Sequence, residues 1–138
     1  MSSESTVAKQ LVRSVLLAND PLRARVAAVV AGHLRSTEAA TLLQTKPLII
    51  LETTGGFARY FSALQDVNFD IYCYSKASSD EALDVYDSVF QILQEACCQA
   101  ANVPMQGIMR ELERPLDGWN EQVGAWFARG GWTLKAVS

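Results

Sequence analysis

The chain has 138 residues, of which 49% are hydrophobic and 20% are charged, and its formal net charge is −3. This is the composition of a globular domain with a buried core, which argues against a disordered or fibrous protein and predicts one domain over residues 1–138. The sequence has no block of basic residues, so it gives no reason to expect specific binding to nucleic acid through phosphate contacts.

Neither a membrane segment nor a disulfide framework is expected. The longest apolar run, residues 26–32, is too short to span a membrane, and residues 1–6 lack the regions of a signal peptide. Of the three cysteines, Cys97 and Cys98 are adjacent, which is not the spacing of a disulfide scaffold. We therefore expect free thiols in a reducing compartment.

The first periodic signal is a helix over residues 6–18. Its apolar side chains recur at helical spacing, at Val7, Leu11 and Val15. Ser5 or Thr6 is a suitable cap for its first turn. The segment Asn19-Asp20-Pro21 ends the helix, because proline has no amide donor and restricts the residue before it.

The next two segments are less regular. Residues 22–34 fit either a second short helix that begins at Pro21 or a buried strand, and the pattern does not choose between them. Residues 35–46 are polar and predict a long loop. Long loops in compact domains are often functional or become ordered on assembly.

Two strands are predicted in the middle of the chain. Residues 47–52 form the first, which a turn at residues 53–56 closes. The second extends to Tyr74 and begins as early as Phe57, so that the two make a long hairpin. Its apolar residues alternate with polar ones, which predicts one buried face and one solvated face; the apolar set is Val67, Phe69, Ile71 and Cys73.

A long amphipathic helix follows. Ser78 is the predicted cap, with Glu81 three residues later in the position of a capping box. We expect the helix to end before residues 102–104. Its apolar stripe consists of Leu83, Tyr86, Phe90, Leu93, Cys97 and Ala100.

The last third of the chain reads as antiparallel strands. Residues 108–114 alternate in character, Asp117-Gly118 is a turn signal, and the segments 123–127 and 132–137 are strands with a bulge at Gly130-Gly131. The predicted fold class is α+β: a mostly antiparallel sheet with an N-terminal helix and one long amphipathic helix packed on one face.

No arrangement of residues predicts catalysis, a cofactor or a metal. His33 is the only histidine, and it lies in an apolar stretch without suggestive neighbours. Cys97 lies on the predicted core stripe and Cys98 near its polar edge, so the pair lacks the spacing of a metal site. The segment 54–57 lacks the Gly-Lys-Ser/Thr ending of a phosphate loop. Asp66 and Asp70 share the solvated face of a strand, where solvation or an interface is the simpler role than acid–base chemistry.

The three tryptophans are the best candidates for recognition. Aromatic side chains and arginine are enriched among the residues that anchor protein interfaces. Trp126 and Trp132 fit a core role as well as an interface role, whereas Trp119 follows a predicted exposed turn and is the better interface candidate. The full set of candidate interface residues is Trp119, Asp117, Arg129, Arg59, Arg35 and Lys46.

The order of these elements resembles the tail-terminator and tail-completion proteins of long-tailed bacteriophages. The resemblance spans nearly the whole chain, and its most telling part is residues 67–96, an aromatic-rich strand, a short polar link and a helix that begins with acidic residues and alanine. The matching segments are Leu17-Ala-Asn-Asp-Pro-Leu22, Lys46-Pro-Leu-Ile-Ile-Leu51, Asp70-Ile-Tyr-Cys-Tyr-Ser-Lys76 and Ser79-Asp-Glu-Ala-Leu-Asp-Val-Tyr86.

The resemblance implies a structural role in a virion, without catalytic residues or cofactors. Proteins of that family form a ring, usually a hexamer, on the end of the tail tube. The ring stops polymerisation of the major tail tube protein and joins it to the head–tail connector protein. The implied location is the tail or neck of the virion, reached through the host cytoplasm during assembly.

Two other hypotheses stay open from the sequence. One is another neck or head-completion protein of the same particle. The other is a small ligand-binding α+β domain, with a pocket between the sheet and the long helix. The residues that would line this pocket are Asp70, Tyr72, Tyr74 and His33.

Overall fold

The computed structural model describes residues 4–54, 58–59 and 64–137, which form an α+β fold. Seven strands make one sheet in this part of the chain, in the order β1-β2-β4-β7-β6-β5, with β3 paired beside β4. The β1–β2 pair is parallel and the other pairs are antiparallel. The strands are β1 (Ala28–Ala31), β2 (Leu48–Thr53), β3 (Ala58–Arg59), β4 (Leu64–Ser75), β5 (Cys97–Cys98), β6 (Gln106–Asn120) and β7 (Ala125–Val137).

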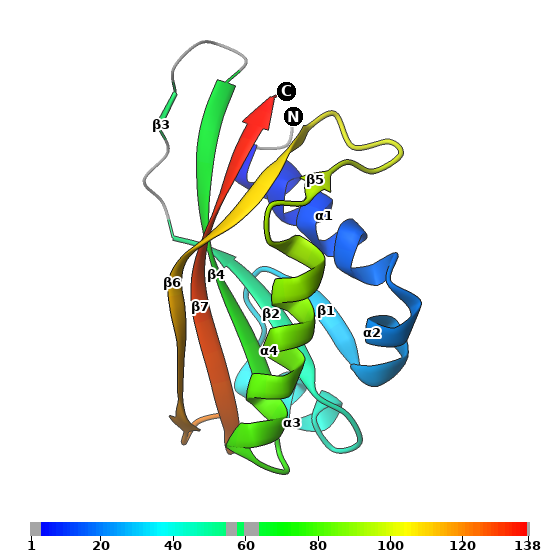
Figure 1. Ribbon diagram of the computed structural model, residues 1–138. Helices are drawn as coiled ribbons and strands as arrows, with labels where there is room; N and C mark the ends of the chain where they lie inside the picture. Colours follow the sequence, from blue (N-terminus) through cyan, green and yellow to red (C-terminus); the bar gives the residue numbers. More distant parts are fainter. Residues whose placement is uncertain (1–3, 55–57, 60–63, 138) are drawn as a thin grey trace.

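The helices form a layer on one face of this sheet. Figure 1 shows α1 (Glu4–Leu17), α2 (Asp20–Arg25) and α4 (Ser79–Leu93) on the same side, as the sequence predicted for the N-terminal and long helices. We call this side the helix face and the opposite side the open face. The predicted alternation along β4 is confirmed, because its apolar set is buried under the helices: Val67, Phe69, Ile71 and Cys73.

The structure resolves the ambiguous N-terminal segments. Both alternatives for residues 22–34 are partly correct, since α2 extends to Arg25 and β1 follows it. The Asn19 side chain accepts a hydrogen bond from the Leu22 amide at 3.0 Å, which caps α2. The predicted cap of the first helix is wrong: α1 already begins at Glu4, so Ser5 and Thr6 lie inside it.

The predicted loop over residues 35–46 is also wrong, because it contains the helix α3 (Ser36–Leu42). Its Ala39 side chain and the following Leu43 pack on Leu48, Ile50 and Tyr74, on the open face of the sheet. These few apolar contacts among polar residues are too weak a pattern to be recognised as a helix. The apolar residues of α3 and Leu43 cover one end of the open face, so β2 is buried on both of its faces.

The long helix begins as predicted and ends early. The Glu81 amide donates to the Ser78 hydroxyl at 3.1 Å, whereas the Glu81 carboxylate accepts from Ser75 at 2.6 Å instead of returning to Ser78. The helix ends at Leu93, well before residue 102, because Glu95 takes a left-handed conformation with φ of 57°.

Residues 97 and 98 therefore lie in a strand. The predicted burial of the two cysteines is reversed: Cys97 is exposed and Cys98 is buried, since strand β5 turns only Cys98 toward the core.

The Ser78 cap leads to a stability prediction. Ser78→Ala is expected to lower the free energy of unfolding by about 1 kcal/mol, because it removes the acceptor of the Glu81 amide. Urea denaturation followed by circular dichroism measures the change. Ser79→Ala, one residue later, is the control and should cost less; an equal loss in both variants would contradict the capping role.

The C-terminal hairpin is longer than predicted. Asp117-Gly118 is not a turn, because both residues lie inside β6, and the chain reverses at residues 121–124 with Gly124 at a φ of 71°. The register irregularity is in β6, between Glu111 and Leu116, and not at the glycines of β7.

A polar network inside the core ties α4 to this hairpin. The Tyr86 hydroxyl donates to the Glu111 carboxylate at 2.6 Å and accepts from the Trp132 indole N–H at 2.9 Å. Gly130 leaves the space that the Tyr86 hydroxyl occupies, since a Cβ at residue 130 would lie only 1.7 Å from the Tyr86 oxygen. Glycine at residue 130 therefore allows the close approach of Tyr86 to β7, and it does not mark a bulge in that strand.

The buried hydroxyl makes the fold sensitive to alkaline pH. Burial, together with the neighbouring Glu111 carboxylate, raises the pKa of Tyr86 above its usual value of about 10. The unfolded chain therefore ionises Tyr86 first, and stability should fall as the pH rises through about 10 and beyond. Urea midpoints measured between pH 8 and 11 test this. In a Tyr86→Phe variant the urea midpoint should fall less steeply with pH. An unchanged slope would contradict the assignment of this pH dependence to Tyr86.

Candidate assembly surface

The exposed apolar side chains of the described residues gather on one hairpin. Each of the large hydrophobic residues exposed in this part of the chain belongs to β6 or β7; they are Ile108, Leu112, Leu116, Trp119, Trp126 and Val137. Exposed apolar surface that is contiguous often marks a site of association. The hairpin is therefore the candidate functional surface of the described fold.

Three of these residues form a row along β6 on the open face. Ile108 precedes the buried Met109, whose side chain is in the core under the helices, so Ile108 points to the other side. Leu112 lies beside Asp70 and Arg129 on the open face, and Leu116 is paired with Arg129. We call Ile108, Leu112 and Leu116 the aliphatic stripe; they are 51%, 58% and 62% exposed.

Two more of these residues, the tryptophans, lie on the opposite side of the hairpin. Trp119 and Trp126 are register partners, and their rings meet edge to face with centroids 4.9 Å apart. Trp126 alternates with Ala125 and Phe127, which belong to the open-face cluster, so it points to the helix face. We call Trp119 and Trp126, which are 48% and 36% exposed, the tryptophan pair.

An ion pair lies beside the aliphatic stripe. The Arg129 guanidinium donates to the Asp70 carboxylate at 2.9 Å, and it lies 6.0 Å from the centroid of the Tyr72 ring. The hydrogen bond to Asp70 raises the pKa of Arg129, so this cation keeps its charge. The Asp70 side chain is only 13% exposed, while Arg129 keeps 34%. Asp70 is thus ion-paired within the sheet, on the same open face of β4 that carries Asp66.

The open edge of β6 is poorly suited to strand pairing. Strand β5 pairs only with Gly107 and Ile108, and no described strand pairs with the outer edge of β6 from residue 112 onward. Pro115 interrupts this edge, and proline cannot donate a ladder hydrogen bond. Natural edge strands use proline to prevent pairing with other chains. The faces of the hairpin are therefore better contact surfaces than its edge.

The structure separates the predicted interface residues into two groups. Trp119, Asp117 and Arg129 all lie on the β6–β7 hairpin. Arg35 and Lys46 flank α3 instead. The Arg35 guanidinium is 3.1 Å from the Glu38 carboxylate, and the Lys46 ammonium donates to the Ala24 carbonyl at 3.1 Å.

The sixth predicted interface residue, Arg59, lies in strand β3, and its side chain is outside the described part of the chain.

The aliphatic stripe was not predicted from the sequence. Its signal is the recurrence of an apolar residue every fourth position, at 108, 112 and 116, and only the burial of Met109 shows which face is free.

The predicted pocket between the sheet and the long helix is wrong. Tyr72 and Tyr74 lie on the open face, away from α4, and the side chain of Tyr74 packs against the α3 cluster. Asp70 is on that face too, and His33 is exposed at the end of β1. The proposed lining residues therefore do not converge between sheet and helix.

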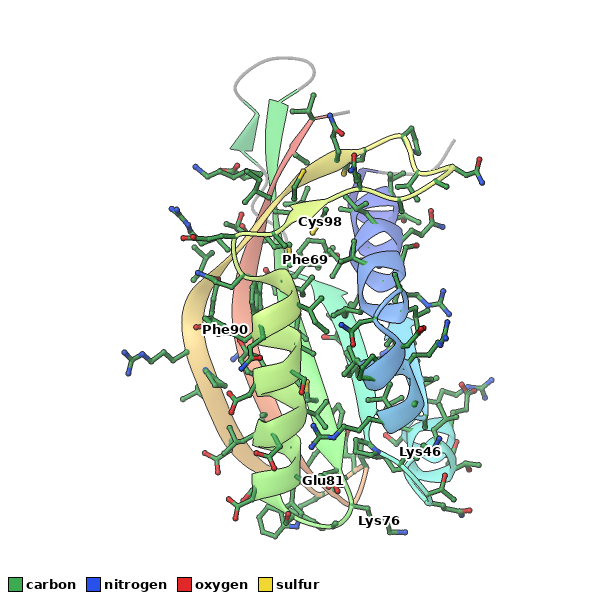
Figure 2. The ribbon with its side chains drawn as sticks, turned by 45° about the vertical axis from the view of Figure 1, so that its right-hand side comes forward. Lys46, Phe69, Lys76, Glu81, Phe90 and Cys98 are labelled. Atoms are coloured by element: carbon green, nitrogen blue, oxygen red, sulfur yellow. The ribbon has the colours of Figure 1, made fainter. Side chains whose placement is uncertain are left out.

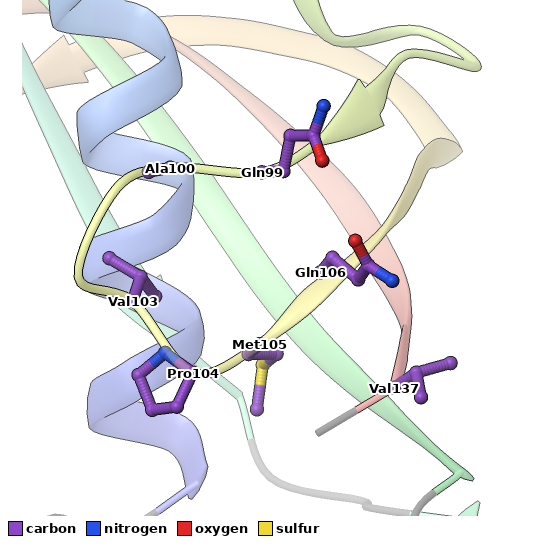
Figure 3. A pocket seen from close by; sticks show the side chains of 7 residues that line it. All are labelled: Gln99, Ala100, Val103, Pro104, Met105, Gln106 and Val137. Atoms are coloured by element: carbon purple, nitrogen blue, oxygen red, sulfur yellow. The ribbon is translucent and has the colours of Figure 1, made fainter.

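A shallow cleft of about 310 Å³ lies between the β5–β6 loop and the end of β7 (Figure 3). Its lining has no ionisable side chain and consists of Gln99, Ala100, Val103, Pro104, Met105, Gln106 and Val137. Such a lining offers no side chain for acid–base chemistry.

Elsewhere, the described residues contain no group of three or more metal-ligating side chains. Within residues 4–54, 58–59 and 64–137, no helix is long and apolar enough to cross a membrane.

The cysteines differ in their expected reactivity. Burial raises the pKa of Cys98 to about 11 and also raises the pKa of Cys73, while Cys97 is exposed. At pH 8, Ellman's reagent should therefore modify one thiol per native chain rapidly and all three after unfolding in urea. A Cys97→Ser variant is the control and should lose the fast phase; a fast phase that survives would contradict the burial of the other two.

Comparisons with known proteins give a structural match and no match by sequence. No protein-family model matches this chain, and no curated protein does. Among solved structures, it is similar to a chain in the virion of a native gene transfer agent (GTA) particle, with a TM-score of 0.71 and 14% sequence identity. The match covers 99% of this chain and 100% of that one, so the two share the whole fold.

Proposed function

We propose that this chain is a structural protein of a phage-like virion, where it forms a homo-oligomeric ring on the end of the tail tube. The observation that carries the proposal is the full-length similarity of fold to a chain from a GTA virion. This similarity agrees with the order of helices and strands, which resembles that of tail-terminator proteins. The ring, a hexamer in this proposal, stops polymerisation of the tail tube protein and joins the tube to the head-side connector.

The exposed surfaces of the hairpin support an assembling role. A subunit of a ring needs contacts on two different faces, because each copy touches two neighbours. The aliphatic stripe and the tryptophan pair lie on opposite faces of the β6–β7 hairpin. The cleft of Figure 3 has no ionisable side chain in its lining, and the described residues contain no group of three or more metal-ligating side chains. The exposed apolar residues of the hairpin therefore support an assembling role better than a catalytic one.

The proposal is tested in particles that lack this chain. We expect tail tubes of irregular, excessive length that do not join heads, as measured on negatively stained particles. Supplying the wild-type chain in trans should restore both the tail length and the joining. Tails of normal length that join heads would overturn the proposal. Tails of normal length that fail to join would favour another neck or head-completion role.

A further inference from the structure

The start of α4 lies beside the tryptophan pair. Ser75 is the register partner of Trp126, and its hydroxyl donates to the Glu81 carboxylate in the first turn of the helix. Ala128, the next residue on the same side of β7, is already buried in the core under the helices. The pair therefore lies at the rim of the packing between α4 and the hairpin, next to the exposed side of the helix.

The flank of α4 that faces the hairpin is acidic. Phe90 marks this flank, because its ring packs on Trp132 of β7. Residues three, four or seven positions apart share one side of a helix, which places Leu83 and Asp87 beside Phe90. Asp80 is three and seven positions from those two and lies on the same flank. Nowhere along its length does α4 carry a basic residue.

Asp117 continues this acidic surface on the hairpin. Its register partner is Ala128, so it lies on the same side of β6 as Trp119, two residues away. The helix dipole favours Asp80 in the first turn, but it does not account for Asp87 or Asp117. We call Asp80, Asp87 and Asp117 the acidic border; all are exposed, and no ion pair among the described residues involves them.

The lysines at this end of the sheet lie on the other side of α4. Lys46 and Lys76 line a cleft together with residues 43–45, next to the start of β2. Strands β2 and β7 are on opposite sides of β4. Figure 2 shows both lysines on the side of α4 that is turned away from β6. On β6 itself, Arg114 is the only basic residue between residues 111 and 120, so carboxylates outnumber cations around the pair.

This chain has few free cations to offer to such a surface on a second copy. Most of its described lysine and arginine side chains already donate to carboxylates or to other oxygen atoms: Arg13, Arg23, Arg25, Arg35, Lys46, Arg110 and Arg129. Lys135 is the register partner of Asp66. A different protein is therefore the better source of the opposite charge.

We propose that the tryptophan pair and the acidic border bind a basic segment of another protein of the particle. Lysine and arginine side chains are attracted to the faces of tryptophan rings, and nearby carboxylates strengthen and orient such a contact. Trp119 and Trp126 keep 48% and 36% of their surface exposed, which leaves ring area for it. The inference rests on the proposed function, in which the ring binds the tail tube protein and the connector as well as its own copies.

The test measures binding of a basic peptide to the full-length chain. The probe is an amidated hexalysine peptide with an N-terminal fluorescein, whose fluorescence anisotropy rises on binding. The same peptide with every lysine acetylated is the uncharged control.

Two double variants remove the two parts of the surface. One carries Trp119→Thr and Trp126→Thr, where threonine keeps strand propensity, and the other carries Asp87→Asn and Asp117→Asn. Circular dichroism verifies that both fold. The matched charge control carries Asp20→Asn and Glu38→Gln, which remove the same charge from α2 and α3.

The wild-type chain should bind the lysine peptide and not the acetylated one, and added salt should weaken the binding. The Kd should rise roughly tenfold in the tryptophan variant and severalfold in the carboxylate variant, whereas the charge control should bind like the wild type. Trp119→Phe with Trp126→Phe keeps aromatic faces and should retain part of the binding. No binding by the wild type, undiminished binding by the tryptophan variant, or equal weakening in the carboxylate variant and the charge control would each overturn the inference.

The mass of the chain separates this surface from a contact between copies. Light scattering during size-exclusion chromatography should give the tryptophan variant the same mass as the wild type. A lower mass for the variant would assign the pair to a neighbouring copy and reject a partner of different sequence.

Failure of this inference is distinguishable from failure of the proposed function. Peptide binding that meets these expectations, together with normal tails in particles that lack the chain, would reject the capping role and keep the basic partner. Irregular tails in those particles, together with a chain that ignores the lysine peptide, would do the reverse.

Discussion

Replacing Trp132 with alanine is expected to lower the free energy of unfolding by about 3–5 kcal/mol, the range for removing a large buried aromatic side chain. Trp132 is fully buried, and its ring packs against Phe90 and Tyr86 with centroids 6.0 and 6.3 Å away. The substitution also removes the N–H that donates to the Tyr86 hydroxyl. Urea denaturation monitored by far-ultraviolet circular dichroism measures the loss.

Trp119→Ala is the matched control for this prediction. Trp119 is 48% exposed, and its main described contact is the edge-to-face pair with Trp126. Its loss should cost about 0.5–1.5 kcal/mol, the range for an aromatic pair. Equal losses for the two variants would show that Trp132 does not occupy the core in the way described.

Adding one methyl group at Gly130 is the second large expected effect. Gly130→Ala should cost about 3 kcal/mol, since the new Cβ would lie 1.7 Å from the Tyr86 oxygen and 2.4 Å from its ring carbon. Tyr86 would have to move, and its bonds to Glu111 and Trp132 would break. The expected result is a large fall in the urea midpoint.

The neighbouring glycine provides a control with a different expected outcome. At Gly131 a Cβ would meet the Glu113 Cβ at 3.4 Å, which is an ordinary contact. Gly131→Ala should therefore be neutral or stabilise the fold by up to about 1 kcal/mol, because alanine restricts the unfolded chain. If both substitutions have the same effect, the close approach of Tyr86 to residue 130 is not what requires glycine there.

The parts of the fold that the sequence predicted have strong local signals. The alternation along β4 and the Ser78 cap of α4 are both visible in a short window, and both are present in the structure. The element order was enough for the fold class, because a sheet with helices on one face follows from those periods.

The errors arose where tertiary contacts override local signals. Asp117-Gly118 reads as a turn, but both residues lie inside β6, where a Cβ at residue 118 would be in tight contact with the Phe127 ring, at 3.0 Å. The end of α4 has no glycine or proline signal, since Glu95 itself takes the left-handed conformation. In α3 only a few apolar contacts mark the buried side.

The candidate surface could be predicted only in part. Trp119 was recognised from its place near a presumed turn, and it is exposed, although in a strand. Trp126 and Trp132 could not be separated by sequence, because both point to the helix face of β7 and only the position of α4 decides which of them is covered. Trp132 packs against α4 in the core, while Trp126 lies near the start of that helix and keeps contact with solvent.

The central position of β4 has a consequence for how the chain folds. β4 pairs with β2 on one side and with β7 on the other, where Leu64 meets Val137 from the far end of the chain. Contacts between residues so distant in sequence form slowly, because a long segment must be ordered first. Until β7 docks, one long edge of β4 stays open to other chains. The docking of β7 thus completes the sheet and ends the period in which the folding chain is most prone to aggregate.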